Sequence, residues 1–138
     1  MGAPFKFSRA VRWDELDTAG FAYFPRVVAL AHEAMERIFE ASSPSAYASL
    51  LATGIGLPCV HVETDFEAPL RFGDVLEVET SVVKLGRSSV ELDVRVRRDG
   101  GAVDCARIRY VVACTDLRKP AAVPLPAGVR AMFLAFMS

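Results

Sequence analysis

A single change of hydrophobic period constrains the fold of this sequence more than any other feature. Between residues 25 and 41, apolar residues recur at spacings of three and four, the pattern of an amphipathic helix. After Gly54-Ile55-Gly56, apolar residues instead alternate with polar ones, which is typical of half-buried strands. We therefore predict an α+β fold in which one antiparallel sheet packs against one long helix.

Five segments carry the strand pattern, one before the helix and four after it. The first strand is expected to place Phe5, Phe7, Val11 and Trp13 on its apolar face. The last three strands are joined by short turns and predict an antiparallel meander, because the turn at residues 99–101 has the sequence Asp-Gly-Gly. A short second helix at 45–52 and a packed segment at 129–137 complete the prediction. The expected strands span residues 5–13, 59–68, 74–84, 89–97 and 105–114.

The charged residues lie on the polar faces of these strands in complementary sets. Acidic and basic side chains on neighbouring strands are expected to pair across the sheet. The balance of 16 Lys and Arg against 17 Asp and Glu follows from this pairing and argues against a nucleic-acid partner. The acidic positions are Glu63, Asp65, Glu77 and Glu79, and the basic ones are Arg95, Arg97, Arg107 and Arg109.

Composition favours one cytoplasmic domain over residues 1–138. No apolar stretch approaches the ~20 residues of a membrane span, and the first residues lack a signal-peptide pattern. Cys59, Cys105 and Cys114 have no CxxC spacing and are expected to be buried, reduced thiols. No His spacing typical of a metal site occurs, so we expect no metal. With 52% hydrophobic residues and nine Phe, we expect a second copy of the chain to cover part of the apolar surface.

The loop before the helix has the residue types of an acyl-transfer site. It carries Asp14, Glu15 and Asp17, then Gly20 and two aromatic residues, and it leads directly into the helix. A helix N-terminus offers unpaired N–H groups to a developing oxyanion, and a neighbouring carboxylate is a candidate base or nucleophile. The alternative is that Asp17 only stabilises a turn.

Four segments of the sequence resemble, in order, motifs of the hotdog-fold acyl-CoA thioesterases. The similarity is strongest to the 4-hydroxybenzoyl-CoA thioesterase subgroup. It implies a five-stranded antiparallel sheet wrapped around one long helix, and acyl-CoA as substrate with no other cofactor. It also implies a homodimer, and further a homotetramer, with the active site at the seam between subunits. The segments are WDELDTAGFAYFP (13–25), FEAPLRFGDVL (66–76), LGRSS (85–89) and VPLP (123–126).

The resemblance assigns catalytic roles to two positions. Asp17 corresponds to the family's catalytic aspartate, as nucleophile or as general base for water. Phe24 corresponds to the backbone N–H that polarises the thioester carbonyl, since Pro25 has no N–H to offer. Tyr23 is expected beside the acyl group.

The same resemblance suggests where the CoA phosphates bind. Arg87, Ser88 and Ser89 match the phosphate-contacting turn, and Lys84 lies close enough in sequence to assist. Guanidinium and hydroxyl groups suit phosphate oxygens. The alternative for Arg87 is a solvated turn residue.

One position departs from the family pattern. His32 stands where these enzymes carry a pocket-facing carboxylate, with Glu33 next to it. The change argues against 4-hydroxybenzoyl specificity. His32 either hydrogen-bonds a different acyl group, orients water or is a buried helix residue, whereas His61 is expected to be structural, at an interface.

Two other functions remain compatible with the sequence. The first is a hotdog hydratase or dehydratase, which uses a His–Asp pair; neither His of this chain adjoins Asp17 in sequence. The second is an acyl-CoA-binding module without turnover.

Overall fold

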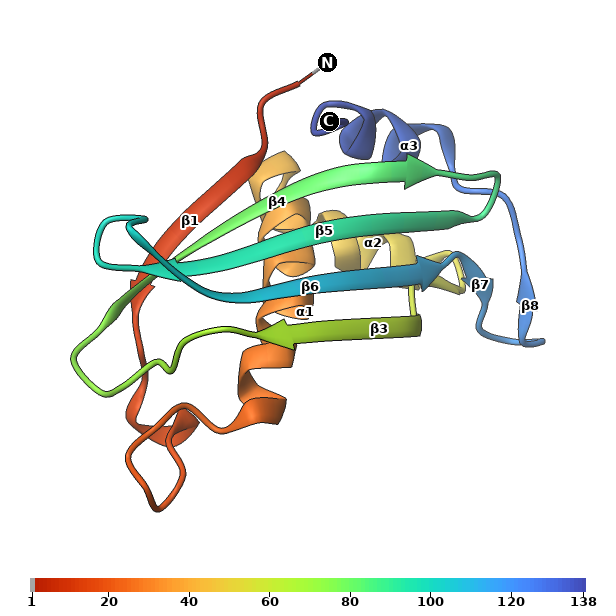
Figure 1. Ribbon diagram of the computed structural model, residues 1–138. Coiled ribbons are helices and arrows are strands. Elements are labelled where there is room, and N and C mark those ends of the chain that lie inside the picture. The colour runs from red at the N-terminus through yellow and green to blue at the C-terminus, as the bar shows by residue number, and fades with distance from the viewer. Residues whose placement is uncertain (1) are drawn as a thin grey trace.

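The structure, a computed structural model, describes residues 2–138 and has a five-stranded antiparallel sheet packed on one long helix (Figure 1). The strand order is β1-β4-β5-β6-β3, so the last three long strands form the predicted meander. These features confirm the predicted fold class. The helix is α1, Phe24–Ser42. The strands are β1, Phe5–Ala10; β3, Cys59–Phe66; β4, Val75–Leu85; β5, Ser89–Arg98; and β6, Val103–Ala113.

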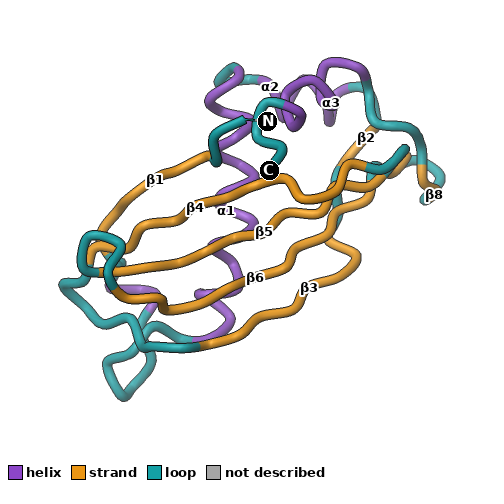
Figure 2. The backbone as a smooth tube through the Cα atoms, turned by 45° about the horizontal axis from the view of Figure 1, so that its top comes forward, coloured by secondary structure: helices purple, strands orange, loops and turns teal. Residues whose placement is uncertain are grey.

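Helix α1 crosses one face of the sheet, as the tube view shows (Figure 2). Its buried stripe includes Leu30, Ala34 and Ile38, which meet the apolar faces of β4, β5 and β6. The opposing positions are valine, leucine and isoleucine, such as Leu92 and Ile108. Each such side chain contributes about 1.5–3 kcal/mol when buried. The alternation along the strands therefore decides which face of the sheet covers the helix.

Smaller elements close the ends of this core. Helix α2, Ala46–Ala52, matches the predicted second helix, and α3, Ala127–Leu134, matches the predicted packed segment. Phe133 of α3 is fully buried, with its ring 5.8 Å from that of Phe39. A second sheet was not predicted, because strands of two residues are too short to show a period. It contains β2, Ile55–Gly56; β7, Thr115–Asp116; and β8, Ala121–Ala122.

The prediction for Trp13 is wrong. The chain leaves the sheet after Ala10, and Trp13 begins a 3-10 turn, η1, Trp13–Glu15. The turn breaks the alternation, so Trp13 is 80% exposed and stacks edge-on against Phe72 at 5.7 Å.

The prediction for the cysteines is partly wrong. Cys105 and Cys114 are buried, and burial raises the pKa of both thiols. Cys59 is exposed, because it starts β3 at the edge of the sheet.

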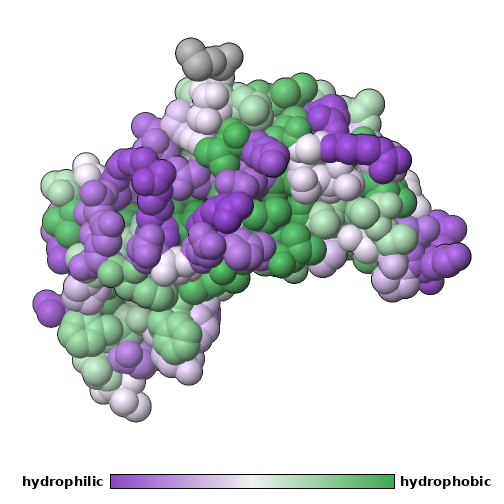
Figure 3. Space-filling view, turned by 45° about the vertical axis from the view of Figure 1, so that its right-hand side comes forward, coloured by the Kyte–Doolittle hydropathy of each residue, from purple (hydrophilic) through white to green (hydrophobic). Residues whose placement is uncertain are grey.

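The edge strand β3 leaves apolar side chains uncovered. Val60, Val62 and Phe66 are all exposed, although the last two alternate toward the helix side of the sheet. In the space-filling view, hydrophobic surface borders a strongly hydrophilic region (Figure 3). Within residues 2–138, no helix is long and apolar enough to cross a membrane.

Candidate active site

The loop between β1 and α1 folds as a small hairpin at one end of the molecule (Figure 1). Leu16 and Ala22 form a bridge within the loop, and Phe21 forms a second bridge with Arg71. Gly20 turns the chain with a φ of +83°, a value that L side chains rarely adopt. The loop is therefore held both by its own ends and by the segment that precedes β4.

Asp17 stands at the start of this hairpin and is exposed. One carboxylate oxygen, Oδ1, accepts the N–H groups of Ala19 at 2.9 Å and Phe21 at 3.1 Å. The Asp17 N–H donates to the Phe21 carbonyl at 2.8 Å. Among residues 2–138, no hydrogen bond engages the second oxygen, Oδ2. Asp17 therefore stabilises the turn and also presents one carboxylate oxygen that is available for chemistry.

The backbone N–H groups just before α1 already donate hydrogen bonds within the chain. Ala22 donates to Leu70 at 2.8 Å, and Tyr23 donates to the Glu15 carbonyl at 2.7 Å. Phe24 comes next, and its N–H has no hydrogen-bond acceptor within the described part of the chain. Pro25 has no N–H. The first donor available to a ligand at this helix end is therefore the Phe24 N–H, the group singled out from the sequence.

Aromatic rings surround this helix end. Tyr23 and Phe24 are both exposed, with ring centroids 5.3 Å apart. The Phe24 ring also lies edge-on to Phe66 at 6.4 Å. Phe24 and Phe66 line a hollow of about 260 Å³, together with Val27 and Leu70. An apolar hollow therefore adjoins the free N–H group.

His32 lies half-way along α1 and connects two polar partners. Its Nδ1 is 3.2 Å from the Tyr110 hydroxyl, and its Nε2 is 2.8 Å from a Glu36 carboxylate oxygen. In the neutral ring, Nε2–H donates to Glu36, and Nδ1 accepts from Tyr110. Burial raises the pKa of Tyr110 to about 12, so the hydroxyl keeps its proton. His32 is thus an exposed residue with fixed partners, so of the three alternatives the buried helix residue is wrong.

Sequence reasoning missed Glu36 and Tyr110. Glu36 is four residues after His32, a spacing that places both on one helix face and that was available in the sequence. Tyr110 is 78 residues away from His32 and meets it only through the packing of β6 on α1. Together with Met35 and Phe39, His32 and Glu36 line a groove of about 350 Å³.

Glu33, the acidic neighbour named from the sequence, belongs to a different cluster. Its carboxylate accepts hydrogen bonds from Arg9 at 2.9 Å and Arg37 at 3.0 Å. Consecutive helix residues point about 100° apart. The carboxylate beside His32 is therefore Glu36.

The predicted phosphate cluster lies at the turn between β4 and β5. Lys84 and Arg87 are exposed there. The backbone of the turn is fixed: the Ser88 carbonyl accepts the Cys114 N–H at 2.6 Å, and Arg130 of α3 donates to the Gly86 carbonyl at 2.6 Å. Ser89 begins β5.

The structure does not bring this turn to the Asp17 loop within one chain. The two lie at opposite ends of the sheet (Figure 1). Asp17, Tyr23 and Phe24 form one group, and Lys84, Arg87, Ser88 and Ser89 form another.

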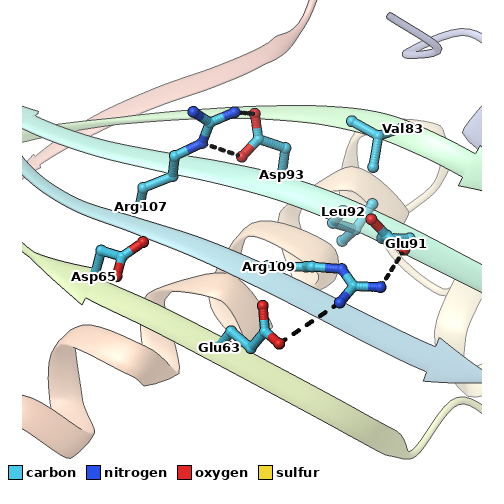
Figure 4. A pocket seen from close by; sticks show the side chains of 8 residues that line it. All are labelled: Glu63, Asp65, Val83, Glu91, Leu92, Asp93, Arg107 and Arg109. Carbon is cyan, nitrogen blue, oxygen red and sulfur yellow. Dashed lines mark hydrogen bonds and ion pairs between the residues drawn. The ribbon is translucent and has the colours of Figure 1, made fainter.

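A larger hollow of about 410 Å³ lies on the sheet face that α1 does not cover (Figure 4). Arg109 reaches Glu91 at 3.0 Å, and Arg107 reaches Asp93 at 3.0 Å. Cross-strand pairing of charges is thus confirmed, but these partners are Glu91 and Asp93 of β5 rather than the expected acidic positions. Of the expected pairs, Arg97 reaches Glu79 at 3.2 Å and Arg109 reaches Glu63 at 3.7 Å. Six of the eight lining residues are charged, and within residues 2–138 all of these except Asp65 form ion pairs, so this hollow is a solvated face.

Neither histidine contacts Asp17 in the described residues. His32 is bound as above, and His61 Nε2 lies 3.0 Å from Glu63. Across residues 2–138, no group of three His, Cys, Asp or Glu side chains is arranged to hold a metal ion.

A family model described as the Thioesterase-like superfamily matches residues 11–133, from the end of β1 into α3. The chain belongs to this superfamily. It is a thioester hydrolase, and both the predicted enzyme class and the hotdog fold are confirmed. The matched range includes the Asp17 loop, α1 and the β4–β5 turn of this thioesterase.

Curated relatives and a solved structure agree with this membership. The thioesterase is 30% identical over 125 residues to 1,4-dihydroxy-2-naphthoyl-CoA hydrolase of Synechococcus elongatus, covering 90% of each chain. It is 32% identical over 122 residues to the enzyme of the same name from Nostoc punctiforme, covering 88% of this chain and 81% of the relative. A crystal structure of a 1,4-dihydroxy-2-naphthoyl-CoA thioesterase from Synechocystis superposes with a TM-score of 0.86 at 26% identity, covering 95% and 96% of the two chains.

Proposed function

We propose that this thioesterase hydrolyses a hydroxylated aryl-CoA, with 1,4-dihydroxy-2-naphthoyl-CoA as the first candidate. The observation that carries the proposal is the arrangement at the start of α1, where Asp17 presents a free carboxylate oxygen and the Phe24 N–H is unpaired among the described residues. The substrate named for the curated relatives supports the choice of acyl group.

The two groups suit the two needs of thioester hydrolysis. The Phe24 N–H, at the positive end of the helix dipole, stabilises the carbonyl oxygen as it gains negative charge. The Asp17 oxygen attacks the carbonyl carbon directly, or removes a proton from a water molecule that attacks it. By either route the carbon–sulfur bond breaks and CoA leaves as thiolate. Attack by water then gives the free acid at once, whereas direct attack leaves the acyl group on Asp17 as an anhydride, which a water molecule hydrolyses to the free acid and the regenerated carboxylate.

The polar cluster on α1 suits the hydroxyl groups of the aryl ring. His32 and Glu36 place donors and acceptors in a groove whose other walls include Met35 and Phe39, and the buried Tyr110 hydroxyl holds His32 in place. An apolar site with a few fixed polar groups favours an aromatic ring that carries hydroxyls. A plain acyl chain displaces water from the exposed His32 and Glu36 without offering a hydrogen bond in return, which costs binding free energy.

We infer that the working enzyme is a homodimer, able to associate further into a homotetramer. The exposed Val60, Val62 and Phe66 on the edge strand β3 are the support for this. Pairing of two β3 edges covers them and extends the sheet. It also offers a way to bring Lys84 and Arg87 of one subunit, with Ser88 and Ser89, toward the Asp17 loop of the other, so that CoA spans the seam.

The experiment compares wild type with Asp17→Asn on three thioesters: 1,4-dihydroxy-2-naphthoyl-CoA, 2-naphthoyl-CoA and a short-chain acyl-CoA. We expect wild type to hydrolyse the dihydroxylated substrate with the highest kcat/KM, and Asp17→Asn to lose at least ~100-fold in kcat. A further assay with an enoyl-CoA tests the hydratase alternative, which predicts hydration of the double bond. Binding of all CoA esters without turnover by wild type indicates the non-catalytic module and contradicts the proposal.

A further inference from the structure

Arg9 of β1 lies at the centre of a compact ion cluster behind the Asp17 loop. Its Nη1 and Nη2 donate to the two carboxylate oxygens of Glu15 at 2.8 and 2.7 Å. Its Nε and Nη2 also donate to Glu33 of α1 at 3.0 and 2.9 Å. One guanidinium thus joins the strand, the 3-10 turn and the helix.

The cluster is buried and its carboxylates are fully bonded. The side chains of Arg9, Glu15 and Glu33 are only 10%, 6% and 19% exposed. The Arg12 N–H donates to Glu15 at 2.7 Å, and Arg37 donates to Glu33 at 3.0 Å. A bidentate guanidinium fixes both the distance and the plane of the carboxylate that it binds. The cluster is therefore a rigid connection.

Both carboxylates are charged at neutral pH. Burial favours the protonated form of Glu15, but hydrogen bonds from Arg9 and from the Arg12 N–H outweigh it, so its pKa lies below the usual range. For Glu33, burial is likewise outweighed by the hydrogen bonds and charges of Arg9 and Arg37, and its pKa is also lowered. The connection is thus ionic at neutral pH.

Glu15 is the point at which this connection reaches the proposed catalytic groups. It lies two residues before Asp17 in the sequence. Its own carbonyl accepts the Tyr23 N–H at 2.7 Å, which leaves Phe24 as the next N–H in the chain. The side chain of Glu15 is thus bound to β1, while its backbone holds the start of α1.

We propose that Arg9, Glu15 and Glu33 are positioning residues for catalysis, which set the place of the Asp17 carboxylate relative to the Phe24 N–H; this inference rests on the proposed function. None of the three contacts substrate in this account. They act through the Glu15 backbone and the loop. A displacement of about 1 Å between reacting groups lowers rates by up to ~100-fold without removing the binding surface.

The test uses Glu15→Gln, which keeps the shape of the side chain but removes its charge. We expect kcat on 1,4-dihydroxy-2-naphthoyl-CoA to fall ~10- to 100-fold while KM changes less than ~3-fold, since binding contacts remain. Glu33 lies on α1 and reaches the loop only through Arg9, so we expect Glu33→Gln to lower kcat less than Glu15→Gln does. Two variants test Arg9. Arg9→Met removes the charge, whereas Arg9→Lys keeps the charge but cannot form the bidentate hydrogen bonds of a guanidinium, so we expect its kcat to lie between those of Arg9→Met and wild type.

The matched control is Asp93→Asn on the outer face of the sheet. Asp93 is 19% exposed, like Glu33, and pairs with Arg107 at 3.0 Å. Removal of this ion pair is expected to leave kcat within about 2-fold of wild type. An equal loss of kcat in Glu15→Gln and Asp93→Asn, in proportion to their loss of stability, overturns the positioning role.

Amide hydrogen exchange provides a readout that does not depend on turnover. In Glu15→Gln we expect faster exchange at Tyr23 and Phe21, whose N–H groups bond within the loop, and unchanged exchange in β5. Unchanged exchange at Tyr23 together with wild-type kcat overturns the inference. Failure of wild type to hydrolyse any thioester instead overturns the proposed function. In that case the exchange data alone decide whether the cluster fixes the loop.

Discussion

Asp17 meets the geometric requirements of two roles that sequence reasoning treats as alternatives, a turn residue and the proposed catalytic carboxylate. Its Oδ1 closes the turn through Ala19 and Phe21, as a structural loop aspartate does. Its Oδ2 is free among the described residues, as chemistry requires. A carboxylate held by one oxygen has a fixed direction for the other, so the turn contacts favour the proposed reaction.

The contacts of His32 lead to a prediction at the same scale. Tyr110→Phe removes the hydroxyl that bonds His32 Nδ1 at 3.2 Å. Loss of one such hydrogen bond costs about 1 kcal/mol, or about 5-fold in kcat/KM. We expect that loss for 1,4-dihydroxy-2-naphthoyl-CoA and little change for 2-naphthoyl-CoA, measured by thiol release. An equal loss on both substrates contradicts a role for the cluster in recognising hydroxyls.

The place of single residues was predicted best where it depends on neighbours in sequence. The polar loop around Asp17 follows from turn chemistry, and the helix start, expected at Pro25 and found at Phe24, follows from the position of the proline. Tyr110 was missed because its partner lies on another element. Glu15 was seen only as a loop acid, since nothing in the local sequence reveals that Arg9 buries it.

Among the secondary-structure elements, those of six residues or more were predictable, whereas the two-residue strands were not. Helix α1 and strands β4, β5 and β6 are long enough to show their period over several residues. The two-residue strands β2, β7 and β8 are defined by pairing alone. The end of β1 was misplaced because a 3-10 turn replaces the last alternation before Trp13.

The connection between β1 and α1 predicts how stability depends on pH. The pKa of Glu15 is lowered in the folded protein, so its stabilisation is complete above the ordinary value of 4.5 and is lost as pH falls through the folded value. We expect urea unfolding to show a falling free energy of unfolding in wild type below about pH 4.5. Glu15→Gln is expected to show a shallower fall.

The comparison isolates Glu15 because other depressed carboxylates, such as Asp14 and Glu91, are the same in both proteins. Parallel pH profiles for wild type and Glu15→Gln contradict the assigned ion pair.

At the scale of the whole molecule, the edge of the sheet defines the expected assembly. Val62 of β3 is exposed and adjoins the helix side of the sheet. A charge placed there blocks strand pairing. We expect Val62→Glu to sediment at the 15.0 kDa of one chain and wild type at twice that mass or more, with loss of turnover in the variant.

Leu134→Glu is the matched control, because Leu134 is also an exposed apolar residue but lies on α3, away from β3. It is expected to keep the wild-type mass and activity. A monomeric wild type with full activity contradicts the shared site.

The central claim is that Asp17 performs the chemistry rather than only closing its turn. Its most direct test is the single-turnover rate of Asp17→Asn on 1,4-dihydroxy-2-naphthoyl-CoA, measured beside its melting temperature. The Asn Oδ1 still accepts the Ala19 and Phe21 N–H groups, so we expect the fold to persist. We predict a rate at least ~100-fold below wild type with a melting temperature within a few degrees. A folded Asp17→Asn protein that hydrolyses the thioester at the wild-type rate contradicts this account.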